Sequence, residues 1–504
     1  MTTDLHEAVK PHYRPDRLNG VDDAFLCLEL PEQPMHIMAL AILRPAERDG
    51  GTSSAITLDD LRRRVARQLD VLPAFRLRVK PLPFSLHHPV FVAVSNLDLD
   101  HHIRRVKLLA PGGPEELGQL YADLAERCLD RSRPLWRITL VDALDSGRQA
   151  LIFEIHHCLM DGAAIRTTFS RLFFSEDTQR AAAPCACRPQ RAPGGTRLVV
   201  DALADHGWGL AQLPALVRKT KRGMAATRKR NARSQIAVPR PRADTPLCSI
   251  NAGFTSERRF ARSSLPLADV KLVKDAAGVT VNDVVLSVVA GALRDYLQRR
   301  NDLPDRPLVA NVPVGLDTPG QPPRAVGNHI GSLVTSLATN VADPWARLET
   351  ISAVTRESKR RLDLLGRQIP GEWLDIVPPA IISAALQRIN RRRRSHPEQL
   401  HTNVTISTLR GPTRPWSFGS AVVEEMYLTA PPNSGVGITF AVWDYAGSLL
   451  VGILACADSV EDPGEVAVGL SSSLSELVAI ARCRQEGSAS LVGAAGTHVT
   501  GGDR

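Results

Sequence analysis

The chain of 504 residues is long enough for two to four domains, each with a sizeable hydrophobic core, which excludes a small disulfide-stapled scaffold. Apolar residues make up 43% and charged residues 23%, as in ordinary globular proteins, so disordered, collagen-like and coiled-coil classes are excluded too. The net charge of +9 is local, because ten Lys and Arg and no acidic residue lie between Arg218 and Arg242. The overall basicity therefore says nothing about the folded parts.

The first part of the chain, residues 1–174, predicts a mixture of short strands and helices. Its strand-like runs are 35–43 and 87–94, and apolar residues recur at helical spacing in 61–69 and 115–129. Residues 136–144 and 150–157 predict two antiparallel strands that face each other across the turn Asp145-Ser146-Gly147. We interpret this part as one αβ half of the protein.

Residues 175–245 have a different composition, rich in Ala, Pro, Arg and Gly, and only 196–222 has helical character. This segment is interpreted as a crossover linker that contains an amphipathic helix. Its basic residues permit three interpretations, which are a solvated charge run, attraction to anionic lipid, and nucleic-acid binding. Aromatic residues are not interleaved with them, so we expect no nucleic-acid partner.

The αβ pattern returns in residues 246–484, which we interpret as a second half of similar size. Helices are expected at 282–300, 345–362 and 463–482, and strands at 307–314, 402–408, 421–428, 436–443 and 448–456. The tail, residues 485–504, carries too little apolar surface to fold and is expected to be disordered. Residues 373–389 precede four consecutive arginines, Arg391 to Arg394, and form a second candidate for a lipid interface, with a core-packed helix as the alternative.

Cysteine spacing and hydropathy indicate a cytosolic protein. The eight cysteines show none of the spacings of a zinc site, so we expect reduced thiols and no metal. The first 20 residues lack the apolar core of a signal peptide. The longest uncharged stretch, 426–443, is interrupted by Pro-Pro-Asn-Ser-Gly and cannot be one membrane-spanning helix, so an integral membrane protein is not expected.

One segment carries candidate chemistry: the strand 150–155 runs directly into His156-His157-Cys158-Leu159-Met160-Asp161-Gly162. Side chains alternate along a strand, so one imidazole can face a cleft while the other packs inside. Asp161 lies near the start of the next helix, where a carboxylate is favoured, and Gly162 allows a sharp turn into it. Both histidines could instead be satisfied polar groups at a strand end, but the full HHxxxDG spacing favours a functional site.

HHCLMDG resembles the HHxxxDG signature of the CoA-dependent acyltransferase superfamily, and its surroundings resemble the bacterial wax ester synthase/acyl-CoA:diacylglycerol acyltransferases. Further segments match that family in order, from LNGVDDAFLCLELPEQPMHI (18–37) and RPLW (133–136) to VNDVVLSVVAGALRDYL (281–297), VPV (312–314), GNHIGS (327–332) and WDYAGSLLVGILACAD (443–458). The resemblance implies an α/β fold with two chloramphenicol-acetyltransferase-like halves and an active-site channel between them. Two segments differ from the family pattern: Gly315-Leu316-Asp317 follows VPV, and 407–412 reads STLRGP.

The resemblance also implies roles for the candidate residues. His157 would be the general base, His156 an orienting or packing partner, and Asp161 a structural ion-pair partner rather than a group that touches substrate. Asn282 and Asp283 open a helix as its N-cap and a first-turn acid, and the resemblance additionally places them near the channel, where the Asn282 amide could donate to the thioester oxygen. GxSxG is absent, so no nucleophilic serine is expected.

The sequence therefore predicts an O-acyltransferase that moves a long fatty acyl group from acyl-CoA to diacylglycerol or to a fatty alcohol. Acyl-CoA is a substrate, and no cofactor is expected. The expected location is the cytoplasm, in peripheral contact with a membrane or a lipid droplet. Two alternatives are a condensation-type acyltransferase that uses a carrier-protein thioester, and a degenerate family member that only binds lipid surfaces.

Overall fold

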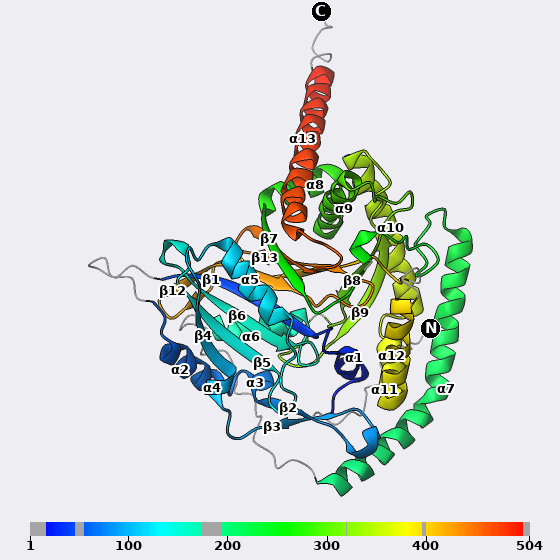
Figure 1. Ribbon diagram of the computed structural model, residues 1–504. Helices are drawn as coiled ribbons and strands as arrows, with labels where there is room; N and C mark the ends of the chain where they lie inside the picture. Colours follow the sequence, from blue (N-terminus) through cyan, green and yellow to red (C-terminus); the bar gives the residue numbers. More distant parts are fainter. Residues whose placement is uncertain are drawn as a thin grey trace, which may run out of the picture.

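Two six-stranded sheets form the framework of the protein (Figure 1). The computed structural model describes residues 17–45, 55–173, 194–251, 253–318, 320–395 and 400–496. The first sheet has the order β11-β12-β1-β6-β5-β4, and the second has the order β7-β14-β13-β10-β8-β9. The predicted α/β class is confirmed.

The strands of the first sheet are β1 (His36–Arg44), β4 (Ile103–Lys107), β5 (Trp136–Asp142), β6 (Gln149–His156), β11 (Ser417–Phe418) and β12 (Ala421–Thr429). The predicted antiparallel pairing across Asp145-Ser146-Gly147 is confirmed, since β5 and β6 pair with Trp136 opposite Ile155. β1 lies on the other side of β6, with His36 opposite His156. A separate hairpin consists of β2 (Leu77–Lys80) and β3 (Val90–Ala93).

The strands of the second sheet are β7 (Arg258–Pro266), β8 (Val309–Gly315), β9 (Ile330–Ser336), β10 (Val404–Arg410), β13 (Ile438–Tyr445) and β14 (Ser448–Cys456). Side chains of β13 alternate between two cores. Ala441 and Trp443 belong to the core shared with the first sheet, whereas Phe440 and Val442 belong to the core under the helices. This sheet is therefore buried on both faces.

Helices cover the outer faces of the sheets (Figure 1). Those of the first half are α1 (Gly20–Leu28), α2 (Leu58–Gln68), α3 (Pro73–Arg76), α4 (Leu99–His102), α5 (Pro114–Ala125) and α6 (Gly162–Phe173). The second half carries α8 (Leu267–Ala277), α9 (Val281–Arg299), α10 (Pro344–Leu365), α11 (Ile369–Ile376), α12 (Pro379–Ser395) and α13 (Pro463–Gly496). By length and composition, Pro463–Glu486 is the one described helix that could cross a membrane, and half of its most apolar window is buried within the protein.

The predicted crossover linker contains α7 (Gly195–Arg233), a helix of 39 residues that runs along the outside of the molecule. Its register places Leu198, Ala202, Gly209, Leu216 and Gly223 on the buried side, so the helix is amphipathic as expected. It packs against α10 and α11 (Figure 1, right). Residues 175–193 of the linker lie outside the described residues.

The structure corrects the predicted segments at two places. Residues 417–429 were assigned to the second half, but β11 and β12 leave it and join the first sheet, where β12 pairs with β1. The apolar side chains of β12 complete the core of the first half, and this burial outweighs proximity along the chain. The last helix also runs to Gly496, into the range 485–504 that was expected to be disordered.

The crossing of β12 over the second sheet depends on a strand glycine. A Cβ on Gly452 of β14 would lie 2.0 Å from the backbone oxygen of Leu428 in β12. We predict that Gly452→Ala pushes the two sheets apart, costs about 1–3 kcal/mol and lowers the melting temperature. Gly315→Ala is the matched control, because a Cβ there meets nothing within 4 Å. Equal melting temperatures of the two variants in a thermal-shift experiment would contradict the prediction.

Candidate active site

The HHxxxDG segment lies where β6 ends and α6 begins. His156 is the last residue of the strand, and its side chain is fully buried, whereas His157 is half-buried. The two imidazoles therefore have different environments, as the alternation of side chains along a strand predicts. From the other half, Gly327 donates its N–H to the carbonyl of Leu159 at 2.6 Å and so joins the segment to the loop before β9.

His156 is engaged on both ring nitrogens. Its Nδ1 accepts the N–H of Cys158 at 3.1 Å, and its Nε2 lies 3.0 Å from Oε2 of Glu29. Burial by itself would raise the pKa of Glu29, but the contact with His156 and the charge of Arg131 act in the opposite direction, and the pKa of Glu29 is lowered to about 2. This arrangement fits the expected orienting partner, and its effect on catalysis stays a prediction.

His157 is held at its backbone, on its ring face and at one ring nitrogen. Its N–H donates to the carbonyl of Met35 at 2.8 Å, and its ring stacks on Phe25 with centroids 3.8 Å apart and planes at 9°. Nδ1 lies 3.0 Å from Oδ1 of Asn328. Burial lowers the pKa of His157 to about 4, so the imidazole is neutral at pH 7 and can accept a proton.

Asp161 satisfies four donors, two from each half of the protein. Oδ1 accepts the N–H groups of Ala163 and Ala164 in the first turn of α6, at 3.1 and 3.0 Å. Oδ2 accepts Nη2 of Arg324 and the N–H of His329, both at 2.8 Å. Asp161 thus has the ion pair that the family resemblance implied, and it joins the two halves beside His157.

The structure requires glycine at position 162 for a different reason from the one expected from the sequence. Its backbone φ is not positive, so the turn into α6 does not require glycine. Instead, a Cβ there would lie 2.1 Å from Cδ2 of Leu409, which belongs to the STLRGP segment. Gly162 therefore allows β10 to approach the start of α6.

The interpretation of Asn282 and Asp283 needs a correction at the helix start. The N-cap of α9 is Thr280, whose hydroxyl accepts the N–H of Asp283 while the Asp283 carboxylate accepts the Thr280 N–H. This reciprocal capping box moves the helix start two residues earlier than predicted and leaves Asn282 as a half-buried first-turn residue. Among the described contacts, none joins either residue to His157, so a role for Asn282 in the channel stays a prediction.

The sequence interpretation missed the residues that surround the two histidines. Asp22, Phe25 and Glu29 lie three to four residues apart on one face of α1 and its end, and Asn328 precedes β9. All four belong to segments that marked the family resemblance, namely 18–37 and 327–332. Their order in the chain was the available signal, but their contact with the histidines depends on the fold.

One departure from the family pattern also lies at the site. Asp317 accepts Nε and Nη2 of Arg324 at 2.7 and 2.9 Å, and its Oδ1 is 3.1 Å from Nδ1 of His329. Arg324 therefore bridges Asp317 and Asp161. These contacts fix the orientation of the guanidinium group that Asp161 requires.

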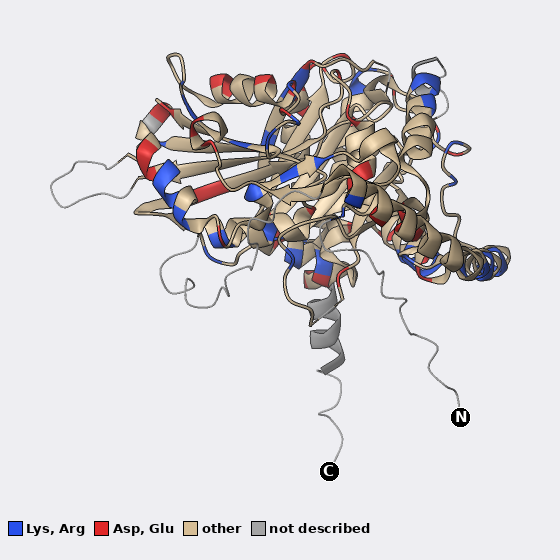
Figure 2. Ribbon diagram, turned by 90° about the horizontal axis from the view of Figure 1, so that it is seen from below, with Lys and Arg blue, Asp and Glu red and all other residues tan. Residues whose placement is uncertain are grey.

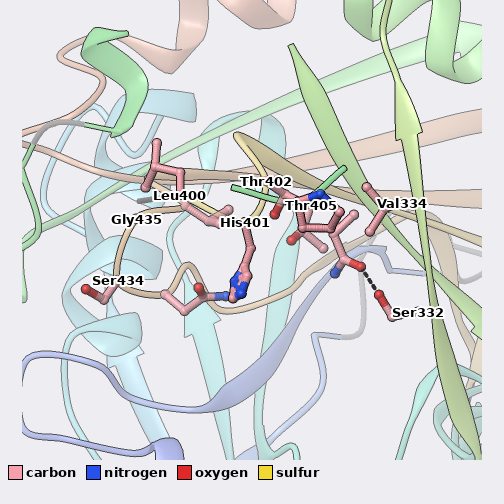
Figure 3. Close-up of a pocket in the computed structure, with 12 residues that line it drawn as sticks. Ser332, Val334, Leu400, His401, Thr402, Thr405, Ser434 and Gly435 are labelled. Atoms are coloured by element: carbon pink, nitrogen blue, oxygen red, sulfur yellow. Dashed lines mark hydrogen bonds between the residues drawn. The ribbon is translucent and has the colours of Figure 1, made fainter. Parts of the chain in front are cut away.

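A cavity of about 300 Å³ opens between the second sheet and the loop 433–436 (Figure 3). Its lining has hydroxyl, amide and apolar groups, among them Ser332, Thr402, Thr405 and Val334. It touches the first half through Ser434, whose N–H donates to Oε1 of Gln33 at 2.9 Å, two residues before Met35. The described residues contain no group of three or more His, Cys, Asp or Glu that could hold a metal.

Two sheets with an HHxxxDG segment where the halves meet define the class of CoA-dependent acyltransferase-like proteins. Residues 18–285 match the model of the wax ester synthase/diacylglycerol acyltransferase catalytic domain, and residues 326–478 match the C-terminal domain of the same enzymes. Together these matches cover most of the chain. The protein belongs to the wax ester synthase/diacylglycerol acyltransferase family.

Sequence relatives and solved structures agree with this assignment. Two candidate diacylglycerol O-acyltransferases of Mycobacterium tuberculosis are 31% and 32% identical over 464 and 476 residues, which is 92% and 93% of this chain and 95% and 98% of theirs. The wax ester synthase/diacylglycerol acyltransferase of Marinobacter aquaeolei superposes with a TM-score of 0.65 at 26% identity, over 92% of this chain and 99% of that one. The cyclization-docking bidomain of EpoB from Sorangium cellulosum has the same fold, at 15% identity and a TM-score of 0.56, over 92% and 84% of the two chains.

We predict that Asp161→Asn lowers stability and activity together. The amide of Asn would place its N–H groups where the Asp161 carboxylate now accepts hydrogen bonds from Arg324 or from the first turn of α6. Breaking a buried ion pair lowers the free energy of unfolding by about 3 kcal/mol. Thermal melting and turnover should both fall. Asp317→Asn, which alters the more exposed partner of Arg324, should lower the melting temperature less. An Asp161→Asn protein that melts like the wild type but has no turnover would instead make Asp161 a chemical participant.

Proposed function

We propose that this protein is an acyl-CoA-dependent O-acyltransferase that transfers a long-chain fatty acyl group to diacylglycerol, giving triacylglycerol, or to a fatty alcohol, giving a wax ester. The observation that carries the proposal is a neutral histidine, His157, held in a fixed orientation where the two halves meet. The names of the sequence relatives and the Marinobacter structure support the same substrates.

The proposed reaction is a direct transfer. The unprotonated nitrogen of His157 takes the hydroxyl proton while the acceptor oxygen attacks the thioester carbon. The tetrahedral intermediate then collapses, the carbon–sulfur bond breaks, and the leaving CoA thiolate takes the proton from the imidazolium. A histidine with a pKa near 4 stays in its basic form down to about pH 5, so catalysis does not require alkaline conditions.

The negative charge on the thioester oxygen needs a hydrogen-bond donor, and we propose the Asn282 side chain for this task. Its place in the first turn of α9 supports the proposal, because the helix dipole also favours negative charge there. Asp283 would act through the capping box, which fixes the start of the helix. The cavity beside Ser332 and Thr405 would receive an uncharged polar part of a substrate, since the described residues that line it include no Asp, Glu, Lys or Arg.

The carrier-protein alternative has weaker support. The likeness to condensation-type structures is below 25% identity and concerns the fold alone, whereas sequence similarity over nearly the whole chain is to the diacylglycerol O-acyltransferases. Incubation of the purified protein with labelled palmitoyl-CoA and either dioleoylglycerol or hexadecanol, followed by separation of the lipids, tests the proposal and identifies the preferred acceptor. Absence of both products would contradict it.

We predict that His157→Ala lowers the rate of product formation by about 10²- to 10⁴-fold, because the general base is lost. His156→Ala should have a smaller effect, since the His156 side chain is fully buried and does not take part in the proposed proton transfer. Circular dichroism and thermal melting of both variants control for folding. A His157→Ala protein that keeps more than about a tenth of the wild-type turnover would rule out the assigned role.

We further propose that α7 binds the surface of a membrane or lipid droplet. One exposed face of this helix is apolar in its first half, with Val200, Leu203 and Leu210 each 59% to 66% exposed. The same face continues as Arg218, Lys221 and Arg228, and Figure 2 shows basic residues gathered on α7 at the right edge of the view. An apolar and cationic face suits an interfacial helix on anionic lipid.

The second candidate for lipid contact has less support. Trp373 in α11 faces α7, where its Nε1 donates to Oγ1 of Thr220 at 3.0 Å. α12 packs on α1 with Ile382 buried, although Ile381 is exposed. Residues 373–389 are thus half-buried or exposed at all positions except 379 and 382. We choose α7 as the membrane surface because it carries several exposed large apolar side chains, whereas Trp373 is covered by α7 itself.

We predict that Arg218→Gln, Lys221→Gln and Arg228→Gln together weaken binding to vesicles that contain phosphatidylglycerol on the order of 100-fold at low salt, at about 1 kcal/mol per charge. The matched control replaces three exposed basic residues of the first half, Arg67, Arg104 and Lys107, by Gln. Sedimentation with vesicles measures both. High salt should reduce the difference, because it screens exposed charges. Equal binding of the two triple variants would exclude α7 as the electrostatic surface.

A further inference from the structure

Asn328 contacts the catalytic candidate at two points. Its Oδ1 lies 3.0 Å from Nδ1 of His157, and its Nδ2 donates to the backbone carbonyl of the same residue at 2.6 Å. Nδ2 also donates to Oδ1 of Asp22 at 2.8 Å. Asn328 is nearly inaccessible to solvent, at 3% exposure. The polar atoms of its side chain are therefore satisfied by these three contacts with protein atoms rather than by solvent.

Counting hydrogens fixes the state of the imidazole. An amide nitrogen carries two hydrogens, and Nδ2 of Asn328 donates one of them to the backbone carbonyl of His157, which can only accept. This contact by itself identifies the nitrogen end of the amide. Oδ1 is therefore the acceptor that faces His157, and Nδ1 of His157 must carry the proton. In a neutral imidazole the other nitrogen, Nε2, then has the free lone pair. Among the described residues, no hydrogen-bond partner engages Nε2.

Asp22 determines which way the amide points. Its Oδ1 accepts both the backbone N–H of Asn328, at 2.7 Å, and the Nδ2 group. A flipped amide would lose its donation to this oxygen and would also place its own oxygen against the backbone carbonyl oxygen of His157, which is repulsive. Asp22 is itself fixed by the capping box of α1, in which its N–H donates to Oδ1 of Asn19 at 2.7 Å. Asn19 also donates to the carbonyl of Asn328 at 3.0 Å.

We propose that Asn328 and Asp22 are positioning residues for acyl transfer, and that Asn328 holds His157 in the tautomer with a basic Nε2 while Asp22 holds Asn328. The inference rests on the proposed function, because it assumes that His157 is the base. The first turn of α1 thereby has a role in catalysis although it does not touch the reacting atoms. Loss of the amide frees the ring to rotate and to exchange tautomers, so fewer molecules are ready to react.

The test compares Asn328→Ala with Gln149→Ala. Gln149 is a matched control, because its buried amide also makes three hydrogen bonds, to Ile56 and Asp142, at the far end of β6. We expect Asn328→Ala to lower kcat by about 10- to 100-fold, with the KM for palmitoyl-CoA changed less than about twofold. Gln149→Ala should lower the melting temperature but leave kcat of the folded protein within about twofold.

Asn328→Asp adds a second readout. A carboxylate beside Nδ1 favours the imidazolium form, so the acidic limb of the kcat/KM profile should move to higher pH by about one unit or more. The other titratable group in contact with Asn328 is Asp22, whose pKa burial raises to about 7, so the limb is read as a shift relative to the wild type, in which Asp22 is also present. A purely structural role for Asn328 would not move this limb, and the near-isosteric variant also serves if Asn328→Ala fails to fold.

The outcomes distinguish failure of the proposed function from failure of the positioning role of Asn328. Absence of both lipid products with the wild-type protein would overturn the proposed function, and an active His157→Ala protein would overturn the assignment of His157 as the base. An inactive His157→Ala protein, together with an Asn328→Ala protein that behaves like Gln149→Ala, would overturn only the positioning role. An unshifted pH limb in Asn328→Asp would also overturn it. A fall in kcat with a shifted limb supports the assignment.

Discussion

The burial of Asp161 between the two halves is the constraint on which the rest of the site depends. A carboxylate that leaves water must find donors, and two of its four donors belong to the loop before β9. The Asp161 carboxylate of the HHxxxDG segment therefore has all four of its donors only when Arg324 and His329 are in place. The same docking brings Asn328 to His157, so the reacting histidine and the interface between the halves form together.

This coupling also explains why the site contains so many polar groups that do not react. Asp22, Asn19 and Asn328 form a buried network in which hydrogen bonds run from α1 to the loop before β9. Burial raises the pKa of Asp22 to about 7, against the effect of the hydrogen bonds from Asn328 and Asn19. Such a network restricts orientation when it is fully satisfied, which suits a base that must present one nitrogen.

The two sheets are joined by more than this polar contact. β12 continues the first sheet, although the strands before and after it along the chain belong mostly to the second, and it packs against β13 and β14. Trp416 and Phe418 lie in the same core as Phe173, the last residue of α6. Apolar burial therefore sets the approach of the halves, and Asp161 and Asn328 select the detailed geometry within it.

The sequence by itself determined the αβ class, the positions of most strands and helices, the HHxxxDG segment and the different environments of its two histidines. These follow from local periodicity, which a single segment displays. Only the tertiary structure decided that Asn328 contacts His157, that Arg324 pairs with Asp161, that Thr280 caps α9, and that β12 crosses into the first sheet. Residues 157 and 328 are 171 positions apart, so no local pattern predicts their contact. It results from burial and hydrogen-bond satisfaction over the whole fold, which act only when both halves are present.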